Sequence, residues 1–281
     1  MSSSSTSPVS NYIHGNAPEE QHRLSLLNDL LNEPLLRELK LNGGERILDV
    51  GSGLGQFSRA MARASGKSAS VIGIERDQDQ LSQARQLAEA DAETELVEFR
   101  QGDALDLPLQ NNEWQSFDIT HTRFLLEHVQ EPIRIVSQMK AATRPGGRVV
   151  LADDDHGGFQ LWPEPLGFPT LWQAYIRAYQ RLGNDPFVGR KLVSLLHCAG
   201  LTQVRNATVF FGGCAGNDAF DLVMGNLLGV FGGARQEMLD NKSLDQNSFD
   251  DAMEALVRWG DDPTTAMWYS LCYAEGFVPL G

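Results

Sequence analysis

The stretch that decides the fold is Ile47-Leu48-Asp49-Val50-Gly51-Ser52-Gly53-Leu54-Gly55-Gln56. Its first four residues read as a short buried strand, and a turn with glycine at every second position follows them. Glycine lets the backbone bend tightly and approach a ligand closely, because it has no Cβ. The helix expected next points its free N–H groups and positive dipole end at the turn. The unit therefore predicts a nucleotide-type pocket, although an ordinary loop between a strand and a helix also fits the glycines alone.

The details of the turn separate two classes of cofactor. The dinucleotide fingerprint G-x-G-x-x-G keeps a small third residue for close packing of helix on strand, but that position is Gln56 here. Asp49 ends the strand, two residues before the first glycine. A carboxylate at this place suits a cofactor with a cationic group and is unfavourable beside a pyrophosphate. These residues argue against an NAD(P)-dependent oxidoreductase of Rossmann type, which stays as the alternative.

Several segments resemble one family in the order in which they occur. The segment D-V-G-S-G-L-G resembles motif I of class I S-adenosylmethionine (SAM)-dependent methyltransferases. Three later segments resemble that family too: G-D-A at 102–104, L-E-H with a proline at 126–132, and R-P-G-G at 144–147. The resemblance covers residues 44–211 well. Y-x-H-G near the N-terminus and D-H-G at 155–157 are similar to the ubiquinone-biosynthesis-like small-molecule branch of the family.

Alternation of strands and helices predicts an α/β fold with a doubly wound, mostly parallel sheet. Five strands are expected at 47–50, 70–75, 96–100, 117–122 and 148–152, and two more at 201–211 and 266–277. The result is a seven-stranded Rossmann-like methyltransferase sheet with a final antiparallel edge and a helical cover over the substrate site. We expect a flexible tail and N-terminal lid at 1–15 and a SAM-binding core at 16–212. The cover is an insertion at about 157–183, and a helical insertion with the last strand fills 213–281.

Candidate cofactor residues lie at the ends of the predicted strands. Glu75 ends the second strand near the spacing at which an acid meets ribose in doubly wound folds, and its carboxylate suits both ribose hydroxyls. Tyr12 and Arg23 are candidates to close over the amino-acid end of the cofactor, or form an ordinary docking helix with a surface arginine. The full set implied for SAM, and for its product S-adenosylhomocysteine, is Tyr12, Arg23, Asp49, Gly51, Ser52, Gly53, Gln56, Glu75, Arg76, Gln80, Gly102, Asp103, Ala104, Thr122 and Arg123.

The loop after the fifth strand carries the candidate acceptor residues. Asp154, Asp155, His156 and two glycines stand at the carboxyl end of the sheet, where such folds bind ligands. His156 is the candidate general base, with Asp155 orienting it, because a base is needed only when the acceptor loses a proton. If the acceptor is an amine, the acids could bind its cation instead, and a solvated turn is the alternative to any functional role. His128, Asp154 and Trp162 are the candidate substrate-binding residues.

Composition limits the partners and the environment. Lys and Arg number 23 against 37 Asp and Glu, which gives a net charge of −14. Such a chain is a poor match for nucleic acid or an anionic membrane surface, because both are bound through cationic contacts. Three cysteines without a C-x-x-C pattern predict no metal site. We expect a cytoplasmic enzyme that methylates a small, partly apolar molecule and could form a homodimer. A non-catalytic SAM-binding scaffold protein stays as a further alternative.

Overall fold

The structure of the chain is a computed structural model. It describes residues 18–240 and 244–281, and within the first helix it describes side chains from Asn28 onward, apart from Asp29. The tail and lid predicted at residues 1–15 lie outside this part. The strands are β1 (Arg46–Val50), β2 (Ser70–Glu75), β3 (Val97–Gln101), β4 (Phe117–Arg123), β5 (Thr143–Asp153), β6 (Gln160–Trp162), β7 (Thr202–Cys214) and β8 (Ala266–Phe277). The α-helices are α1 (Pro18–Leu39), α2 (Gln56–Ser65), α3 (Gln78–Ala90), α4 (Pro132–Ala142), α5 (Phe168–Arg181), α6 (Leu192–Cys198), α7 (Asp218–Asp240) and α8 (Gln246–Gly260), and the 3-10 helices are η1 (Leu126–His128), η2 (His156–Gly158) and η3 (Val188–Lys191).

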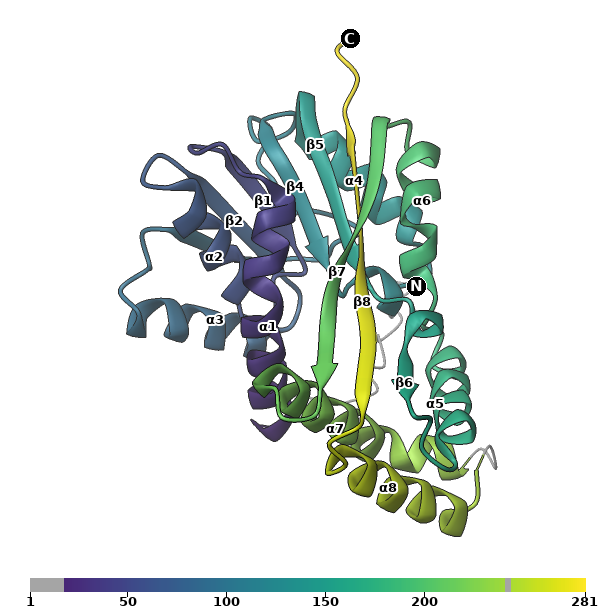
Figure 1. Ribbon diagram of the computed structural model, residues 1–281. Helices are drawn as coiled ribbons and strands as arrows, with labels where there is room; N and C mark the ends of the chain where they lie inside the picture. Colours follow the sequence, from purple (N-terminus) through teal and green to yellow (C-terminus); the bar gives the residue numbers. More distant parts are fainter. Residues whose placement is uncertain (1–17, 241–243) are drawn as a thin grey trace, which may run out of the picture.

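One mostly parallel sheet forms the centre of the molecule (Figure 1). Its order is β3-β2-β1-β4-β5-β8, and β5 is the last parallel strand because β8 runs antiparallel to it. β7 pairs with β8 along most of its length, so the predicted antiparallel edge is confirmed. The part of the chain that the structure describes forms eight strands, where the sequence predicts seven. The additional strand is β6, which has three residues and pairs with the start of β8.

Helices cover both faces of the sheet, as the alternation of strands and helices predicts. Successive residues of a strand point to opposite faces, and the β1 residues Ile47 and Leu48 accordingly belong to two different buried clusters. The cluster around Ile47 includes residues of α1, α2 and α3. The cluster around Leu48 includes residues of α4 and α6. β1 and β2 are buried on both sides along most of their length, which explains their apolar runs.

Three further helices, α5, α7 and α8, lie beyond the carboxyl ends of the parallel strands (Figure 1). Their buried faces continue the cluster around Ile47, with Phe231 of α7 in edge-to-face contact with Trp172 and Tyr175 of α5. Helices α7 and α8 lie in the chain between β7 and β8, where the sequence predicts a helical insertion. None of the helices in the two described ranges is long and apolar enough to cross a membrane.

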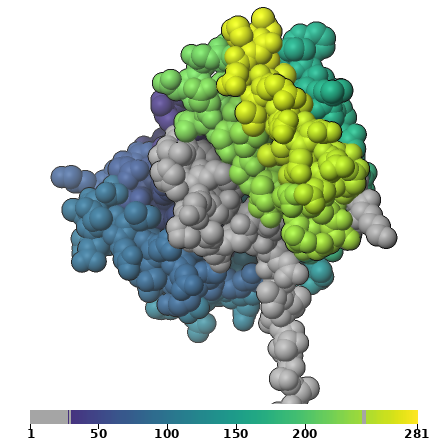
Figure 2. All heavy atoms as spheres, turned by 90° about the horizontal axis from the view of Figure 1, so that it is seen from below, coloured from purple at the N-terminus to yellow at the C-terminus, as the bar shows by residue number. Residues whose placement is uncertain are grey.

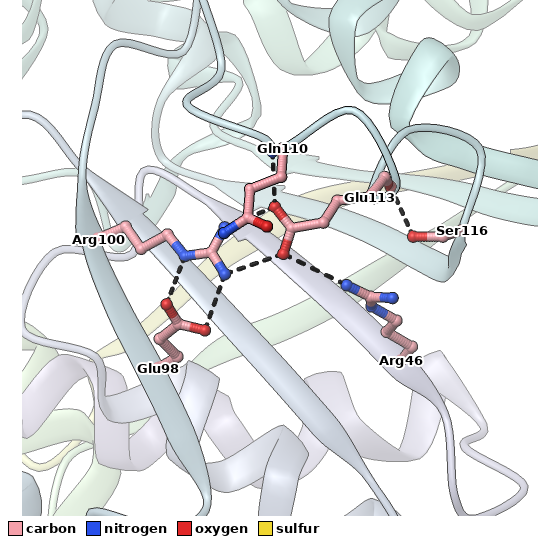
Figure 3. Close-up of polar contacts among 6 residues, drawn as sticks. All are labelled: Arg46, Glu98, Arg100, Gln110, Glu113 and Ser116. Atoms are coloured by element: carbon pink, nitrogen blue, oxygen red, sulfur yellow. Dashed lines mark hydrogen bonds and ion pairs between the residues drawn. The ribbon is translucent and has the colours of Figure 1, made fainter.

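A buried carboxylate ties the connection between β3 and β4 to the amino-terminal part of the sheet (Figure 3). Glu113 accepts hydrogen bonds from Nη1 and Nη2 of Arg100 at 2.7 and 2.9 Å, and from the backbone N–H of Gln110 at 2.8 Å. Arg46 at the start of β1 reaches the same carboxylate at 3.4 Å. Arg100 also pairs with Glu98 on its own strand at 2.6 and 2.8 Å. The hydrogen bonds from Arg100, outweighing burial, hold the pKa of Glu113 below its usual value.

This network predicts a pH-dependent contribution to stability. Replacing Glu113 by Gln should lower the free energy of unfolding by about 2 kcal/mol at pH 7, because the buried cation of Arg100 loses one of its two partners. The pKa of Glu113 is depressed in the folded state, so its contribution is complete above the unfolded pKa and is lost as the pH falls through the folded pKa. Urea unfolding at pH 7 and at lower pH measures the difference between the two proteins.

The matched control is Glu254→Gln on α8, an exposed carboxylate in an i,i+4 pair with Arg258. It should change the free energy of unfolding by less than about 0.5 kcal/mol at either pH. A Glu113→Gln effect no larger than this control at pH 7, or one that grows as the pH falls, would contradict the account.

Candidate active site

A cavity of about 660 Å³ opens where the parallel strands end. Figure 2 views the molecule from this side, and it shows residues of the first half of the chain (blue) and of the last third (green to yellow) on opposite sides of this face. Both parts line the cavity: β1, β2 and β4 supply residues from one side, and α5, α7 and β8 from the other. The site is thus assembled between the sheet and its helical cover.

One end of the cavity, which we call the glycine end, is formed by residues 51–57 and 75–80. Gly51, Gly53 and Gly55 have φ values of 76°, 54° and 71°, a region that side chains with a Cβ rarely adopt. A Cβ on Gly55 would also lie 2.2 Å from the ring of Phe99. Helix α2 begins at Gln56 without a side-chain cap, so its first N–H groups are available to a ligand. The glycine turn and the helix start that the sequence predicts are therefore both present at this end of the cavity.

Glu75 faces the glycine end from the end of β2. Its Oε2 accepts a hydrogen bond from Gly53 N–H at 2.9 Å, and its Oε1 accepts one from Asp77 N–H at 2.8 Å. Each carboxylate oxygen keeps a further lone pair for a ligand hydroxyl. Burial raises the pKa of Glu75, against the lowering effect of these two hydrogen bonds. The carboxylate is therefore fixed in place with acceptor capacity left over, as a ribose ligand requires.

Asp49 is held by two protein side chains. Its Oδ2 accepts from the Ser58 hydroxyl at 2.5 Å, and its Oδ1 lies 2.8 Å from Nδ1 of His121. His121 lines the cavity, is 1% exposed, and has no hydrogen-bond partner at Nε2. If Nδ1 donates to Asp49, Nε2 is left as an acceptor toward the cavity. His121 was not predicted from the sequence. Its contact with Asp49 follows only from the pairing of β1 with β4, in which the two residues lie opposite each other.

A polar network at the glycine end joins α1 to the sheet. Arg123 donates through Nη2 to Asn28 at 2.5 Å, and Asn28 donates to Gln56 at 2.8 Å. The guanidinium of Arg123 also lies over the ring of Phe57, 4.6 Å from its centroid. Burial lowers the pKa of Arg123 to about 10, so the group stays cationic at neutral pH. Asn28 was not predicted from the sequence, because its helix carries no motif.

The predicted cofactor residues divide by position. The set that lines the cavity is Asp49, Gly51, Ser52, Gly53, Gln56, Glu75, Arg76, Gln80 and Arg123. Gly102, Asp103 and Ala104 are not in the lining, although Gln101 beside them is. Asp103 instead accepts from Leu105 N–H at 2.9 Å within a turn. Its suggested role toward the adenine stays a prediction.

Thr122 does not reach the cavity. Its hydroxyl donates to the carbonyl of Val50 at 2.8 Å, and the residue is fully buried between strands. The predicted pocket role of Thr122 is therefore wrong, because its side chain points into the packed sheet. Tyr12 and the side chain of Arg23 lie outside the residues that the structure describes.

The other end of the cavity, which we call the aromatic end, carries six rings: Phe159, Trp172, Tyr175, Tyr179, Phe211 and Tyr269. His156 is packed among them, stacked on Tyr175 with ring centroids 5.6 Å apart and edge-on to Tyr179 at 5.2 Å. Trp172 donates its Nε1–H to the carbonyl of His156 at 3.0 Å. Burial lowers the pKa of His156 to about 3, so the imidazole is neutral at pH 7.

Three buried carboxylates border the aromatic end. Asp153 is fully buried, and burial raises its pKa to about 7. Burial also raises the pKa of Glu127 and of Asp154, and neighbouring carboxylates raise both further. Glu127 and Asp154 line the cavity beside His156. Sequence reasoning selected His128 from the L-E-H segment and passed over Glu127, whose burial no local pattern reveals.

The four other residues predicted for the acceptor side differ in their position relative to the cavity. His128 and Asp154 line the cavity, and burial lowers the pKa of His128 to about 4. Asp155 does not line it: Arg190 holds its carboxylate with two hydrogen bonds of 2.7 and 2.6 Å, so it does not orient His156 as predicted. Trp162 on β6 is 69% exposed and does not line the cavity, so the structure gives its predicted role in substrate binding no support.

Comparisons with known proteins agree with this geometry. Residues 41–164 match the family described as "Methyltransferase domain". The 27-O-demethylrifamycin SV methyltransferase of Amycolatopsis mediterranei is 32% identical over 56% of this chain and 54% of its own. A demethylmenaquinone methyltransferase of Bacillus cereus is 25% identical over 63% of this chain and 78% of its own. The chain spans about half the length of the first curated relatives that it matches.

Solved structures share the fold. A methyltransferase-like protein of Bacillus halodurans superposes with a TM-score of 0.57 at 19% identity, over 88% of this chain and 98% of its own. Geranyl diphosphate C-methyltransferase of Streptomyces coelicolor, solved with Mg²⁺, geranyl diphosphate and S-adenosylhomocysteine, gives 0.54 at 14% identity, over 94% and 85%. Residues 41–164 therefore match a methyltransferase domain, and the sheet order agrees with the fold of these solved structures.

Proposed function

We propose that this protein transfers a methyl group from SAM to a small-molecule acceptor and releases S-adenosylhomocysteine. The observation that carries the proposal is the continuity of the cavity. One end offers the glycine turn and Glu75, which suit a nucleoside with free ribose hydroxyls. The other end offers aromatic rings and His156, which suit a partly apolar acceptor. A cofactor seated at the glycine end would therefore share one cavity with its acceptor.

In methyl transfer from a sulfonium, the main task of the protein is to position the acceptor against the methyl group. A lone pair of the acceptor forms a bond to the methyl carbon, and the electron pair of the carbon–sulfur bond returns to sulfur, which becomes a neutral thioether. Because the sulfonium is already activated, proximity and orientation supply most of the acceleration. A hydroxyl acceptor must also release a proton. We propose that the uncharged imidazole of His156, at the aromatic end, accepts it.

The two alternative functions make different demands. A dinucleotide oxidoreductase keeps a small residue at the third position of its glycine fingerprint for close packing of helix on strand, but Gln56 stands there and its side chain accepts from Asn28. A non-catalytic SAM-binding scaffold would use the same glycine end, and turnover separates it from an enzyme. Nucleic acid is a weak candidate acceptor because the chain carries a net charge of −14. A cytoplasmic location and a homodimer stay predictions.

The cofactor assignment predicts a selective loss of affinity. Glu75→Ala should weaken the binding of S-adenosylhomocysteine by about 30-fold, because two ribose hydrogen bonds of about 1 kcal/mol each are lost. Calorimetric titration of both proteins measures the change, with NAD as the competing ligand class. Glu254→Ala, an exposed carboxylate on α8, is the matched control and should leave the affinity unchanged. Tighter binding of NAD than of S-adenosylhomocysteine would refute the assignment.

The role proposed for His156 predicts a loss of turnover without a loss of cofactor affinity. His156→Gln should reduce turnover at least about 100-fold and change the affinity for S-adenosylhomocysteine less than about twofold, because His156 lies at the aromatic end. Release of S-adenosylhomocysteine in the presence of small hydroxyl and amine acceptors measures turnover. His197→Gln, on the exposed side of α6, is the control and should behave as wild type. Full turnover by His156→Gln would remove this residue from the reaction.

A further inference from the structure

Three potential metal ligands converge at the aromatic end of the cavity. Nε2 of His156 lies 3.8 Å from Oε2 of Glu127 and 3.9 Å from Oδ2 of Asp154. One ligand atom from each of the three residues lies within 4.8 Å of the others. Glu127 follows β4 and the other two follow β5, so adjacent parallel strands deliver them to one point. The sequence predicts no metal site because these residues form no spaced motif of cysteines or histidines.

Each of the two carboxylates has one buried oxygen atom without a hydrogen-bond partner. The side chain of Glu127 is 6% exposed, yet its Oε2 has no hydrogen-bond partner. Oδ1 of Asp154 is likewise buried without one. Among the side chains that the structure describes, no Lys or Arg forms an ion pair with Glu127, Asp153 or Asp154. Burying unpaired carboxylates is unfavourable unless a cation accompanies them, so this end of the cavity is suited to a positively charged ligand.

We propose that Glu127, Asp154 and His156 bind a divalent first-row transition-metal ion such as Mn²⁺ or Zn²⁺. An imidazole together with two carboxylates is a common ligand set for such ions, and three protein ligands leave positions open for a substrate. Two atoms bound to one ion at about 2.1 Å lie about 3–4 Å apart, and the separations of His156 from both carboxylates fall in this range. The imidazole favours a metal over an organic ammonium, which needs acceptors but no ring nitrogen.

Neighbouring groups fix the ligands in position. Asp153 accepts from the N–H of Leu126 at 2.8 Å and from the N–H of Asp154 at 3.1 Å, so one carboxylate ties together the segments that carry the ligands. The backbone N–H of His156 donates to the carbonyl of Pro186 at 2.9 Å. Metal sites usually have such supporting hydrogen bonds around their ligands. Hydrogen bonds from backbone N–H groups therefore hold the segments that carry the three ligands, and the cluster does not depend on flexible surface side chains.

The ion would deepen the proposed function, on which this inference rests. Its open positions face the cavity at the aromatic end, where an oxygen of the acceptor could bind it and be held in place. His156 would then act as a metal ligand in place of a general base.

Titration of the full chain with Mn²⁺ after removal of metal by a chelator tests the site, with the electron paramagnetic resonance signal of free Mn²⁺ as the readout. We expect one saturable site per chain. Glu127→Gln and Asp154→Asn, which keep the side-chain shape, should each weaken binding at least tenfold. Glu254→Gln, at an exposed carboxylate on α8 that does not line the cavity, is the matched control and should bind Mn²⁺ as wild type does. Circular dichroism and binding of S-adenosylhomocysteine check that each variant is folded.

The outcomes separate this inference from the proposed function. Wild-type protein without saturable Mn²⁺ binding, or variants that bind as wild type does, would overturn the metal site even if S-adenosylhomocysteine binds. Saturable Mn²⁺ binding that both variants weaken would support it. If S-adenosylhomocysteine failed to bind while Mn²⁺ bound in this pattern, the proposed function would fail and the site would stand as a metal site of another activity.

Discussion

In-register parallel pairing of β1 with β2 and β4 is the constraint on which the whole site depends. Val50 lies across from Ile74, so the glycine turn and Glu75 emerge side by side from neighbouring strands. Asp49 lies across from His121 in the same way on the other side. A shift of one residue in either pairing would turn these side chains to the opposite face. The hydrogen bond from Gly53 to Glu75 is possible only because this register holds.

The helical cover turns an open strand edge into a partly enclosed cavity. Parallel strands end at one edge, and ligands of such folds bind there. Helices α5 and α7 close that edge with aromatic side chains, among them Trp172, Tyr175 and Phe231. This burial disfavours the charged forms of the carboxylates of Glu127, Asp153 and Asp154, because it removes water from around them. Their pKa values rise as a result. A cation in the cavity, whether a metal ion or the sulfonium of a cofactor nearby, offsets that cost.

Local patterns in the sequence were sufficient for the sheet and for the glycine end. Apolar runs separated by glycines specify buried strands and turns. Glu75 could be predicted because it ends the second strand near the spacing from the glycine turn that is typical of a ribose-binding acid. The network around Arg123 and Asn28 could not be predicted, because it joins residues 95 positions apart. The same holds for Asp155, whose partner Arg190 is 35 residues away. Trp162 looked like a pocket residue by type alone, while its exposure follows from its place on β6.

A crystal structure of the chain with S-adenosylhomocysteine would test the central claim most directly, namely that one cavity holds cofactor and acceptor in line. The account predicts ribose hydroxyls within hydrogen-bond distance of Glu75 and the cofactor sulfur directed toward the aromatic end, next to Glu127 and His156. It would be contradicted by a ligand bound outside the cavity. It would equally be contradicted by a sulfur atom that faces away from the aromatic rings, because no acceptor in that cavity could then receive the methyl group.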